Sequence, residues 1–462
     1  MFKITKRKIF LTAIIVLFLV GQFSQSNVLA QGGVTFSETQ TENHFPDSMT
    51  FRVNVSSKVR DIVSAQFVFI AERYYSINNY ARADVDVATG ADVTLEFTLE
   101  SGTAVPMTPF TYYWDVVDSQ GVHHQSETKT VRYEDTRYNW QELKNSKVWV
   151  LWHDQPDSFG KNIFEIANQA IQQQNSLFHS DLDYQIIILI YDDFDEFAAW
   201  HGIAHDWVGG QSFPEFGITT QIVEDTSDQF WLEAVIPHEI SHLYFEQVTY
   251  NPKVSVPVWL NEGVAQYNEF STNSLALRNV RSSAQNEDLI SLASLENGFG
   301  AFNEDRVHLA YDEALSAVTY LVAFYGEADL GALLKAYKQG ITTNDAFRSA
   351  LGVDARTFES DWAEWAGFPG EYVPPTPRSL PTFIPSPTMF VHGSSPPTPA
   401  TAIAQGHHNQ EGVKTPTPLE ENPPATNRNI PCVSGFLALG LGLTVWLPSH
   451  HKKHFKEQQR DG

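Results

Sequence analysis

The chain has 462 residues, which at about 150 residues per domain excludes one small module and leaves room for two or three domains. Hydrophobic residues make up 42% of the chain and aromatic residues 13%, so we expect a packed core and exclude global disorder. The net charge of −25 would repel a phosphate backbone, so no nucleic-acid partner is expected, and the single cysteine, Cys432, cannot form a disulfide within the chain.

The N-terminus has the three parts of an export signal. Basic residues between Lys3 and Lys8 precede an apolar run at 9–20, and the residues up to Ala30 fit a signal-peptidase site. The alternative is a membrane anchor, but the apolar run would form a helix of roughly 18 Å, against a hydrocarbon core of about 30 Å. We therefore predict a cleaved signal peptide at residues 1–30.

Residues 31–136 contain short segments rich in Thr, Val, Phe and Tyr, separated by polar and glycine-containing breaks. Polar and apolar residues alternate most clearly at 94–99. Short strands at this spacing predict an all-β sandwich of immunoglobulin or fibronectin type. The expected strands are 49–55, 62–71, 92–100, 109–118 and 127–133. Because this region has no catalytic motif, a spacer or a packing partner for the next domain is favoured over a recognition module.

Between residues 137 and 372 the pattern changes to mixed α and β, which makes the fold class of the whole chain α+β. Strands are expected at 147–151, 184–191 and 217–223, and helices at 160–177, 228–249, 259–269, 307–325 and 328–338. We therefore predict a mixed sheet followed by a helical C-terminal part.

The rest of the chain has the composition of a membrane tether. Residues 373–429 are rich in Pro, Thr, Ser and Gly and predict a disordered stalk. Residues 430–447 carry no charge and would form a helix of roughly 27 Å, followed by a basic cytoplasmic tail at 448–462. This predicts one transmembrane helix, with the folded part outside the cell membrane of a bacterium. Cys432 after a proline also resembles C-terminal sorting signals of bacterial surface proteins, and processing there is left open.

The strongest functional signal is the motif His238-Glu239-Ile240-Ser241-His242, inside an apolar-periodic helix. Side chains at positions i and i+4 lie on one face of a helix, so both imidazoles can bind one metal ion. The glutamate between them can hold a water molecule next to the metal and act as general base. The alternative is a pair of core histidines with a surface glutamate.

A third metal ligand is expected, because two histidines leave a catalytic zinc site one protein ligand short. Glu262 follows twenty residues later, on a helix whose start is marked by Pro257. A carboxylate buried in an apolar helix is costly unless it is paired or bound to a metal. We predict that His238, His242 and Glu262 bind one Zn²⁺ ion per chain.

These motifs resemble the gluzincin metallopeptidases, and the Asn-Glu-Gly form at Asn261 to Gly263 is closest to the aminopeptidase N branch and the peptidase MA-like families. The resemblance covers residues 145–367. It implies a thermolysin-like catalytic domain, with zinc between a sheet-bearing part and a helical part. It further implies hydrolysis of peptide bonds, with Glu239 as general base and the substrate paired on an edge strand. We expect the edge-strand region at residues 209–223 and the strand that pairs with the substrate at 217–223.

The resemblance also implies a side chain that donates a hydrogen bond to the oxyanion. Tyr311 is the candidate, His308 is the competing donor, and the alternative for Tyr311 is a simple interface aromatic. The element with which aminopeptidase N-like enzymes bind a free amino terminus has no counterpart at residues 210–215, where the only acidic residue is Glu215. We therefore expect an endopeptidase.

Three further points stay open. A run of four carboxylates could bind calcium, although a solvated loop is favoured; it comprises Asp192, Asp193, Asp195 and Glu196. The expected partners are a peptide or protein substrate and the membrane, and we expect a monomer. The alternative functions are a surface-anchored binding or adhesion protein with a structural or vestigial zinc site, and a zinc hydrolase acting on a non-peptide bond.

Overall fold

The computed structural model describes residues 33–70, 81–102, 104–201, 209–270, 274–299, 302, 304–375 and 444–445. The predicted signal peptide, almost all of the stalk, the basic tail and Cys432 lie outside the described residues. The same holds for the predicted transmembrane helix, except for residues 444 and 445.

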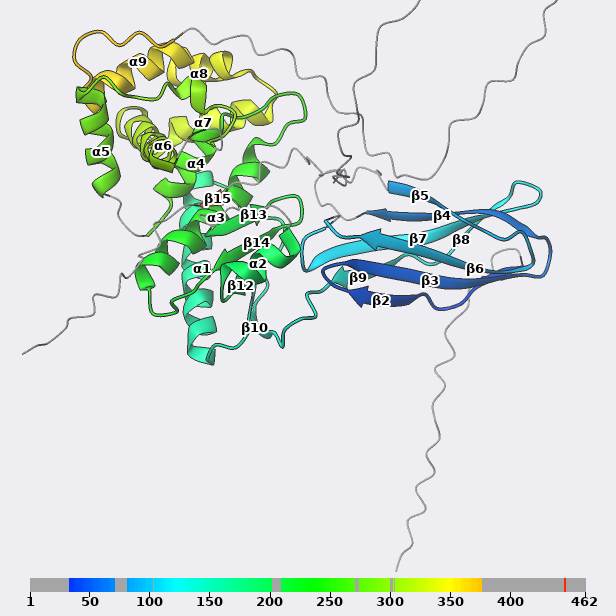
Figure 1. Ribbon diagram of the computed structural model, residues 1–462. Helices are drawn as coiled ribbons and strands as arrows, with labels where there is room; N and C mark the ends of the chain where they lie inside the picture. The colour runs from blue at the N-terminus through cyan, green and yellow to red at the C-terminus, as the bar shows by residue number, and fades with distance from the viewer. Residues whose placement is uncertain are drawn as a thin grey trace, which may run out of the picture.

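Two antiparallel sheets form the N-terminal part (Figure 1). In the first sheet β3 pairs with three strands; its members are β1 (Val34–Phe36), β2 (Gln40–His44), β3 (Ser48–Ser57) and β6 (Asp92–Glu100). The second sheet is centred on β7; its members are β4 (Ile62–Ile70), β5 (Ala81–Val85), β7 (Thr108–Asp118), β8 (His123–Gln125) and β9 (Lys129–Tyr133). All five predicted strands are confirmed, and the unpredicted ones have only three to five residues each.

The two sheets pack through the aromatic side chains that their period-two alternation turns inward. The rings of Phe51 on β3 and Phe67 on β4 lie 4.7 Å apart between centroids, and Trp114 on β7 is fully buried. A β-sandwich packing therefore holds this part together, while the immunoglobulin or fibronectin topology stays a prediction.

A mixed six-stranded sheet follows, in the order β10-β11-β12-β14-β13-β15. The strands are β10 (Gln141–Lys144), β11 (Val148–Trp152), β12 (Ile186–Tyr191), β13 (Gly210–Phe213), β14 (Ile218–Ile222) and β15 (Thr444–Val445). The three central strands β11, β12 and β14 run parallel, and each of the others is antiparallel to its neighbour.

The expectation of an edge strand within residues 217–223 is wrong. Strand β14 lies between β12 and β13, so both of its edges are paired. Apart from the two-residue strand β15, the outermost strand on this side is β13, which turns into β14 through a tight hairpin that ends at Gly217 with a φ of 68°. Four residues without an apolar run give β13 too weak a signal to be recognised. On its outer edge β13 pairs with β15, formed by the two described residues of the predicted transmembrane helix.

Helices pack against this sheet and form the C-terminal part (Figure 1). Helices α1 (Asp157–Phe178) and α3 (Gln229–Thr249) cover one face, and α2 (Phe194–His201) contributes to the core on the other face. Helix α4 (Val258–Tyr267) packs on α3. The others are α5 (Ser274–Gln285), the 3₁₀ helix η1 (Leu292–Leu295), α6 (Glu304–Tyr325), α7 (Glu327–Lys338), α8 (Thr343–Leu351) and α9 (Ala355–Ala366). The five predicted helices are confirmed within a few residues at their ends.

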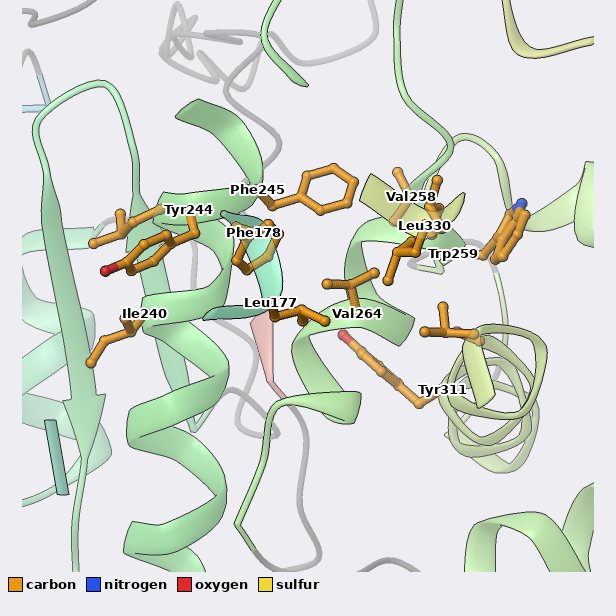
Figure 2. Close-up of a cluster of buried hydrophobic side chains, with 14 of the residues drawn as sticks. Leu177, Phe178, Ile240, Tyr244, Phe245, Val258, Trp259, Val264, Tyr311 and Leu330 are labelled. Atoms are coloured by element: carbon orange, nitrogen blue, oxygen red, sulfur yellow. The ribbon is translucent and has the colours of Figure 1, made fainter. Parts of the chain in front are cut away.

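Alternate residues of the central strands enter two different cores. Ile188 of β12 packs in the core that α1, α3 and the C-terminal helices share, part of which is drawn in Figure 2. Its neighbours Ile187 and Leu189 belong to a second core that is continuous with the interior of the β-sandwich. The sheet is also joined to the segment that follows the sandwich, because the buried hydroxyl of Tyr191 on β12 donates to Asp135 Oδ2 at 3.1 Å. The N-terminal part is thus packed on the catalytic sheet, which supports its expected role as a packing partner.

Within the described residues, no single helix has the length and apolarity needed to span a bilayer. One pair, Arg306–Tyr325 with Glu327–Lys338, meets the criterion jointly but is bent by 116°.

Candidate metal centre and active site

Helix α3 carries the predicted histidines and begins at a capping residue, since the side chain of Asp228 accepts a hydrogen bond from the Trp231 N–H. Pro237 lies inside the helix and lacks the N–H that would bond the carbonyl of Glu233. That carbonyl instead accepts from the backbone N–H of Phe270 at 2.9 Å. The proline therefore ties the helix to the loop that follows α4.

Helix α4 brings Glu262 to the histidines. The helix starts after Pro257, as predicted, and its first N–H, of Val258, donates to the carbonyl of Glu296. It packs tightly on α6 at Gly263, where a Cβ atom would lie 2.3 Å from the carbonyl oxygen of Ala314. This close approach requires glycine, and it fixes the depth at which Glu262 enters the site.

The three predicted ligands lie together and are fully buried. Their ligand atoms are all within 4.8 Å of one another; Glu262 Oε2 is 3.4 Å from His238 Nε2 and 3.9 Å from His242 Nε2. Tetrahedral zinc with ligands at about 2.1 Å needs ligand atoms about 3.4 Å apart. These three residues therefore fit a zinc ion.

The hydrogen bonding of these side chains gives a second test. The atoms His238 Nε2, His242 Nε2 and Glu262 Oε2 are buried without a hydrogen-bond partner. Buried polar atoms are normally satisfied, so three orphaned atoms that face one another indicate a bound group. A metal ion provides the missing partner for all three.

The outer nitrogens of both histidines are held in place. His238 Nδ1 lies 2.8 Å from Glu269 Oε1, and His242 Nδ1 lies 2.9 Å from Asn261 Oδ1. Such partners fix the ring orientation and leave Nε2 for the metal. The sequence analysis quoted Asn261 only as part of a motif and did not find Glu269, which lies in the loop beyond the end of α4.

Glu239 lies beside the metal ligands, against the edge strand. Its Oε2 accepts from the Ser212 hydroxyl at 2.6 Å, while its Oε1 has no partner. Gly210 lies so close that a Cβ atom there would be 2.9 Å from Oε1. The sequence analysis missed Ser212, because the short strand β13 was not recognised.

The buried charges shift one another's protonation. Burial opposes protonation of His238, but Glu262 and Glu269 outweigh it and raise the pKa of His238 to about 10. Burial, helped by His238, lowers the pKa of His242 well below its usual range. Burial raises the pKa of Glu262, although His238 opposes this, and it raises the pKa of Glu239 to about 8. Three carboxylates, those of Glu239, Glu262 and Glu269, thus lie around two buried histidines, and a divalent cation would offset their negative charge.

Tyr311, the predicted oxyanion donor, lies on α6 and is buried in the helical core. Its side chain extends toward Val264 on α4 (Figure 2), and its ring packs edge-on against Phe299 at 4.9 Å between centroids. His308 lies one turn earlier on the same helix. The catalytic role of either residue stays a prediction.

The run of carboxylates after β12 has local roles. Asp193 Oδ1 accepts the Glu196 N–H near the start of α2, Asp192 accepts from Gln155, and Glu196 lies 3.1 Å from His153 Nε2. Within the described ranges, the ligand triad of α3 and α4 is the only group with metal-ligand spacing. Calcium binding by Asp192, Asp193, Asp195 and Glu196 therefore has no structural support.

Two histidines four residues apart, a glutamate between them and a carboxylate from the next helix have the arrangement of a gluzincin metal site and could hold a metal ion. Comparison with protein families agrees, since residues 166–367 match the Peptidase MA superfamily. This match confirms the resemblance seen in the motifs.

Further comparisons are distant. No curated protein matches the chain. Among solved structures, Legionella pneumophila aminopeptidase A in complex with aspartic acid is similar with a TM-score of 0.36 and 12% identity, over 72% of this chain and 50% of that one. Wild-type OgpA from Akkermansia muciniphila is similar with a TM-score of 0.19 and 10% identity, over 22% of this chain and 29% of that one. The chain thus spans half the length of the first structure and less than a third of the second.

Proposed function

We propose that this chain is an exported, membrane-tethered zinc metallopeptidase that cleaves peptide bonds within a polypeptide. The observation that carries the proposal is a set of four buried polar atoms without partners: His238 Nε2, His242 Nε2, Glu262 Oε2 and Glu239 Oε1. Three suit a metal, and the fourth belongs to the side chain that suits a general base.

The division of labour follows from these side chains. A bound zinc ion would supply Lewis-acid polarisation of the scissile carbonyl and of the attacking water. Glu239 takes a proton from that water and delivers it to the leaving amine. Tyr311 is proposed to donate to the oxyanion.

A catalytic site is favoured over a structural one. Structural zinc sites use four protein ligands, whereas catalytic sites keep one position open. The group found among the described residues has three members, since Glu269 binds the outer nitrogen of His238 instead of joining them. This argues against an adhesion protein with a structural zinc.

Endopeptidase action is supported by the residues of the edge strand. An aminopeptidase needs a carboxylate for the substrate's ammonium group, because an unpaired charge in a cleft is costly. The β13 residues that face Glu239 are Gly210 and Ser212, both uncharged, and Glu215 lies in the turn after the strand. Peptides with an acetylated amino terminus should therefore be cut at internal bonds. Release of single residues from free amino termini only would overturn this assignment.

Membrane attachment rests on the sequence. Pairing of β15 with β13 and insertion of residues 430–447 into a bilayer exclude each other, because the same residues cannot occupy both places. In the proposed working state these residues are in the membrane, and the edge of β13 is open to an extended peptide. Protease added to intact cells should release the folded part by cutting the stalk, and a protected folded part would contradict the topology.

Two variants test the zinc peptidase itself. Glu239→Gln in the full chain should retain one zinc while peptide turnover falls by roughly 100-fold or more, because only the proton acceptor is lost. Glu262→Ala should lose zinc, because a ligand is removed. Glu165→Ala, an exposed residue of α1, is the control and should change neither. If elemental analysis finds no zinc in the unsubstituted chain, or if Glu239→Gln retains full turnover, the proposal is wrong.

A further inference from the structure

The edge strand β13 touches the general base at two alternate residues. Residues 210 and 212 face helix α3, while Phe213 packs in the opposite core. Gly210 brings the strand backbone against Glu239 Oε1, and Ser212 brings a hydroxyl to Oε2. Strand β13 therefore contacts both oxygens of the Glu239 carboxylate.

The Ser212 hydroxyl has two acceptors on the same residue. Its Oγ is 2.6 Å from Glu239 Oε2 and 2.7 Å from the Glu239 backbone oxygen, and the side chain is 2% exposed. The last torsion of a glutamate is broad and has little preference of its own. An outside hydrogen bond is thus needed to fix the plane of this carboxylate, and Ser212 supplies one from a rigid strand.

The second carboxylate oxygen of Glu239, Oε1, is available to accept a proton. Oε1 is buried and has no hydrogen-bond partner, so it is the atom that can accept a proton from water. A general base must lie within hydrogen-bond reach of the proton it takes, so its orientation governs the rate.

We propose that Ser212 is a positioning residue for Glu239: its hydroxyl holds Oε2 so that Oε1 faces the attacking water. Since β13 is also the strand whose outer edge can pair with an extended backbone, one short segment sets both the position of the substrate and the orientation of the base. This inference rests on the proposed function.

The test compares two hydroxyl deletions on one face of the sheet. Thr219 lies directly opposite Ser212 on β14 and is fully buried, and its hydroxyl accepts a hydrogen bond from Gln221. In the zinc-loaded full chain, Ser212→Ala should lower kcat for an acetylated peptide by roughly 10- to 100-fold. KM should change by less than about twofold, because the backbone of β13 remains. Thr219→Val should leave kcat within about twofold.

A double variant and two physical measurements separate positioning from folding. If Ser212 acts through Glu239, adding Ser212→Ala to Glu239→Gln should give no further loss of kcat, because the effects of groups that act as a unit do not add. Zinc content and the thermal unfolding midpoint of Ser212→Ala should match those of Thr219→Val. Unchanged kcat in Ser212→Ala, a full additional loss in the double variant, or loss of zinc would overturn the inference. If Glu239→Gln itself stays active, the proposed function fails instead.

Discussion

At the scale of single residues, the candidate site depends on side chains that hold the three candidate metal ligands and Glu239 in place. Glu269 and Asn261 contact the outer nitrogens of the two histidines, and Ser212 contacts the Glu239 carboxylate. The ligands follow a spacing that the helix period explains, so they are readable from the sequence. Asn261 lies next to Glu262 on α4 and is part of the same motif. Glu269 and Ser212 come from a loop and from strand β13, whose approach depends on tertiary packing, so these two supports are not readable from the sequence.

Removing the support of His238 should weaken metal binding without removing a ligand. Glu269→Ala leaves His238 Nδ1 buried without its partner at 2.8 Å, so zinc affinity should fall by roughly 10- to 100-fold. Competition with a chromogenic chelator measures this affinity. The exposed Glu165→Ala should bind zinc like the unsubstituted chain, and an equal affinity in Glu269→Ala would refute the supporting role.

At the scale of elements, the packing of α4 on α6 sets the position of the carboxylate ligand. A Cβ atom at Gly263 would lie 2.3 Å from the backbone oxygen of Ala314, which cannot move without moving α6. The approach is therefore limited to glycine at this one position of the helix.

A pair of glycine substitutions tests that packing. Gly263→Ala should lower the free energy of unfolding by about 3 kcal/mol or more, because the two helices must separate. Gly331→Ala, inside α7 with nothing within 4 Å of the added carbon, should instead raise it by roughly 0.5–1 kcal/mol through helix propensity. Denaturant unfolding measures both. A stabilised Gly263→Ala would show that α4 does not pack as described.

Elements were predictable where apolar segments have a clear length and composition. Helices α3 and α6, with 21 and 22 residues, are too long for strands, and β12 is a six-residue apolar run rich in isoleucine. Strand β13 has only four residues and was not recognised in the sequence. Strand β14 is buried at all five positions, as expected for a strand inside a sheet. The order of strands is decided by pairing between distant segments, which is why the edge was assigned to the wrong strand.

At the scale of the whole molecule, a buried carboxylate joins three distant segments. Glu359 on α9 accepts from the Leu292 N–H and from the hydroxyl of Tyr372, in the segment that leads to the stalk. Burial raises the pKa of Glu359 from 4.5 to about 7. Between these values the folded chain binds more protons than the unfolded chain, so this group makes the free energy of unfolding fall as pH rises from about 4.5 to about 7.

A pH series on one variant measures that contribution. Glu359→Gln cannot ionise, so its stability relative to the unsubstituted chain should increase by about 2.5 kcal/mol between pH 5 and pH 8. Glu364→Gln, an exposed change on the same helix, should give no such trend. A difference for Glu359→Gln that is constant with pH would contradict the assignment.

The continuous core between sandwich and catalytic sheet was outside the reach of sequence analysis. Period two predicts that the two faces of β12 differ, but both faces are apolar, as Ile187 and Ile188 show. Which partner covers each face depends on the linker that carries Asp135 to Tyr191. The N-terminal part could therefore be predicted as a sandwich and as a spacer or packing partner, but not which face of the six-stranded sheet it covers.

Pro237 leaves the carbonyl of Glu233 free to bond the loop after α4, at a cost to the stability of helix α3. A helix with alanine in place of this proline should be a better helix by itself, since proline costs about 3 kcal/mol in a helix interior. The new N–H of Pro237→Ala, however, would bond the Glu233 carbonyl that now holds the Phe270 N–H, next to Glu269. The exchange should raise the unfolding midpoint of the zinc-free chain and lower its affinity for zinc. A substitution that thermal screening would select as stabilising would then reduce zinc binding. Measuring the unfolding midpoint and the zinc affinity of Pro237→Ala would test whether they change in opposite directions.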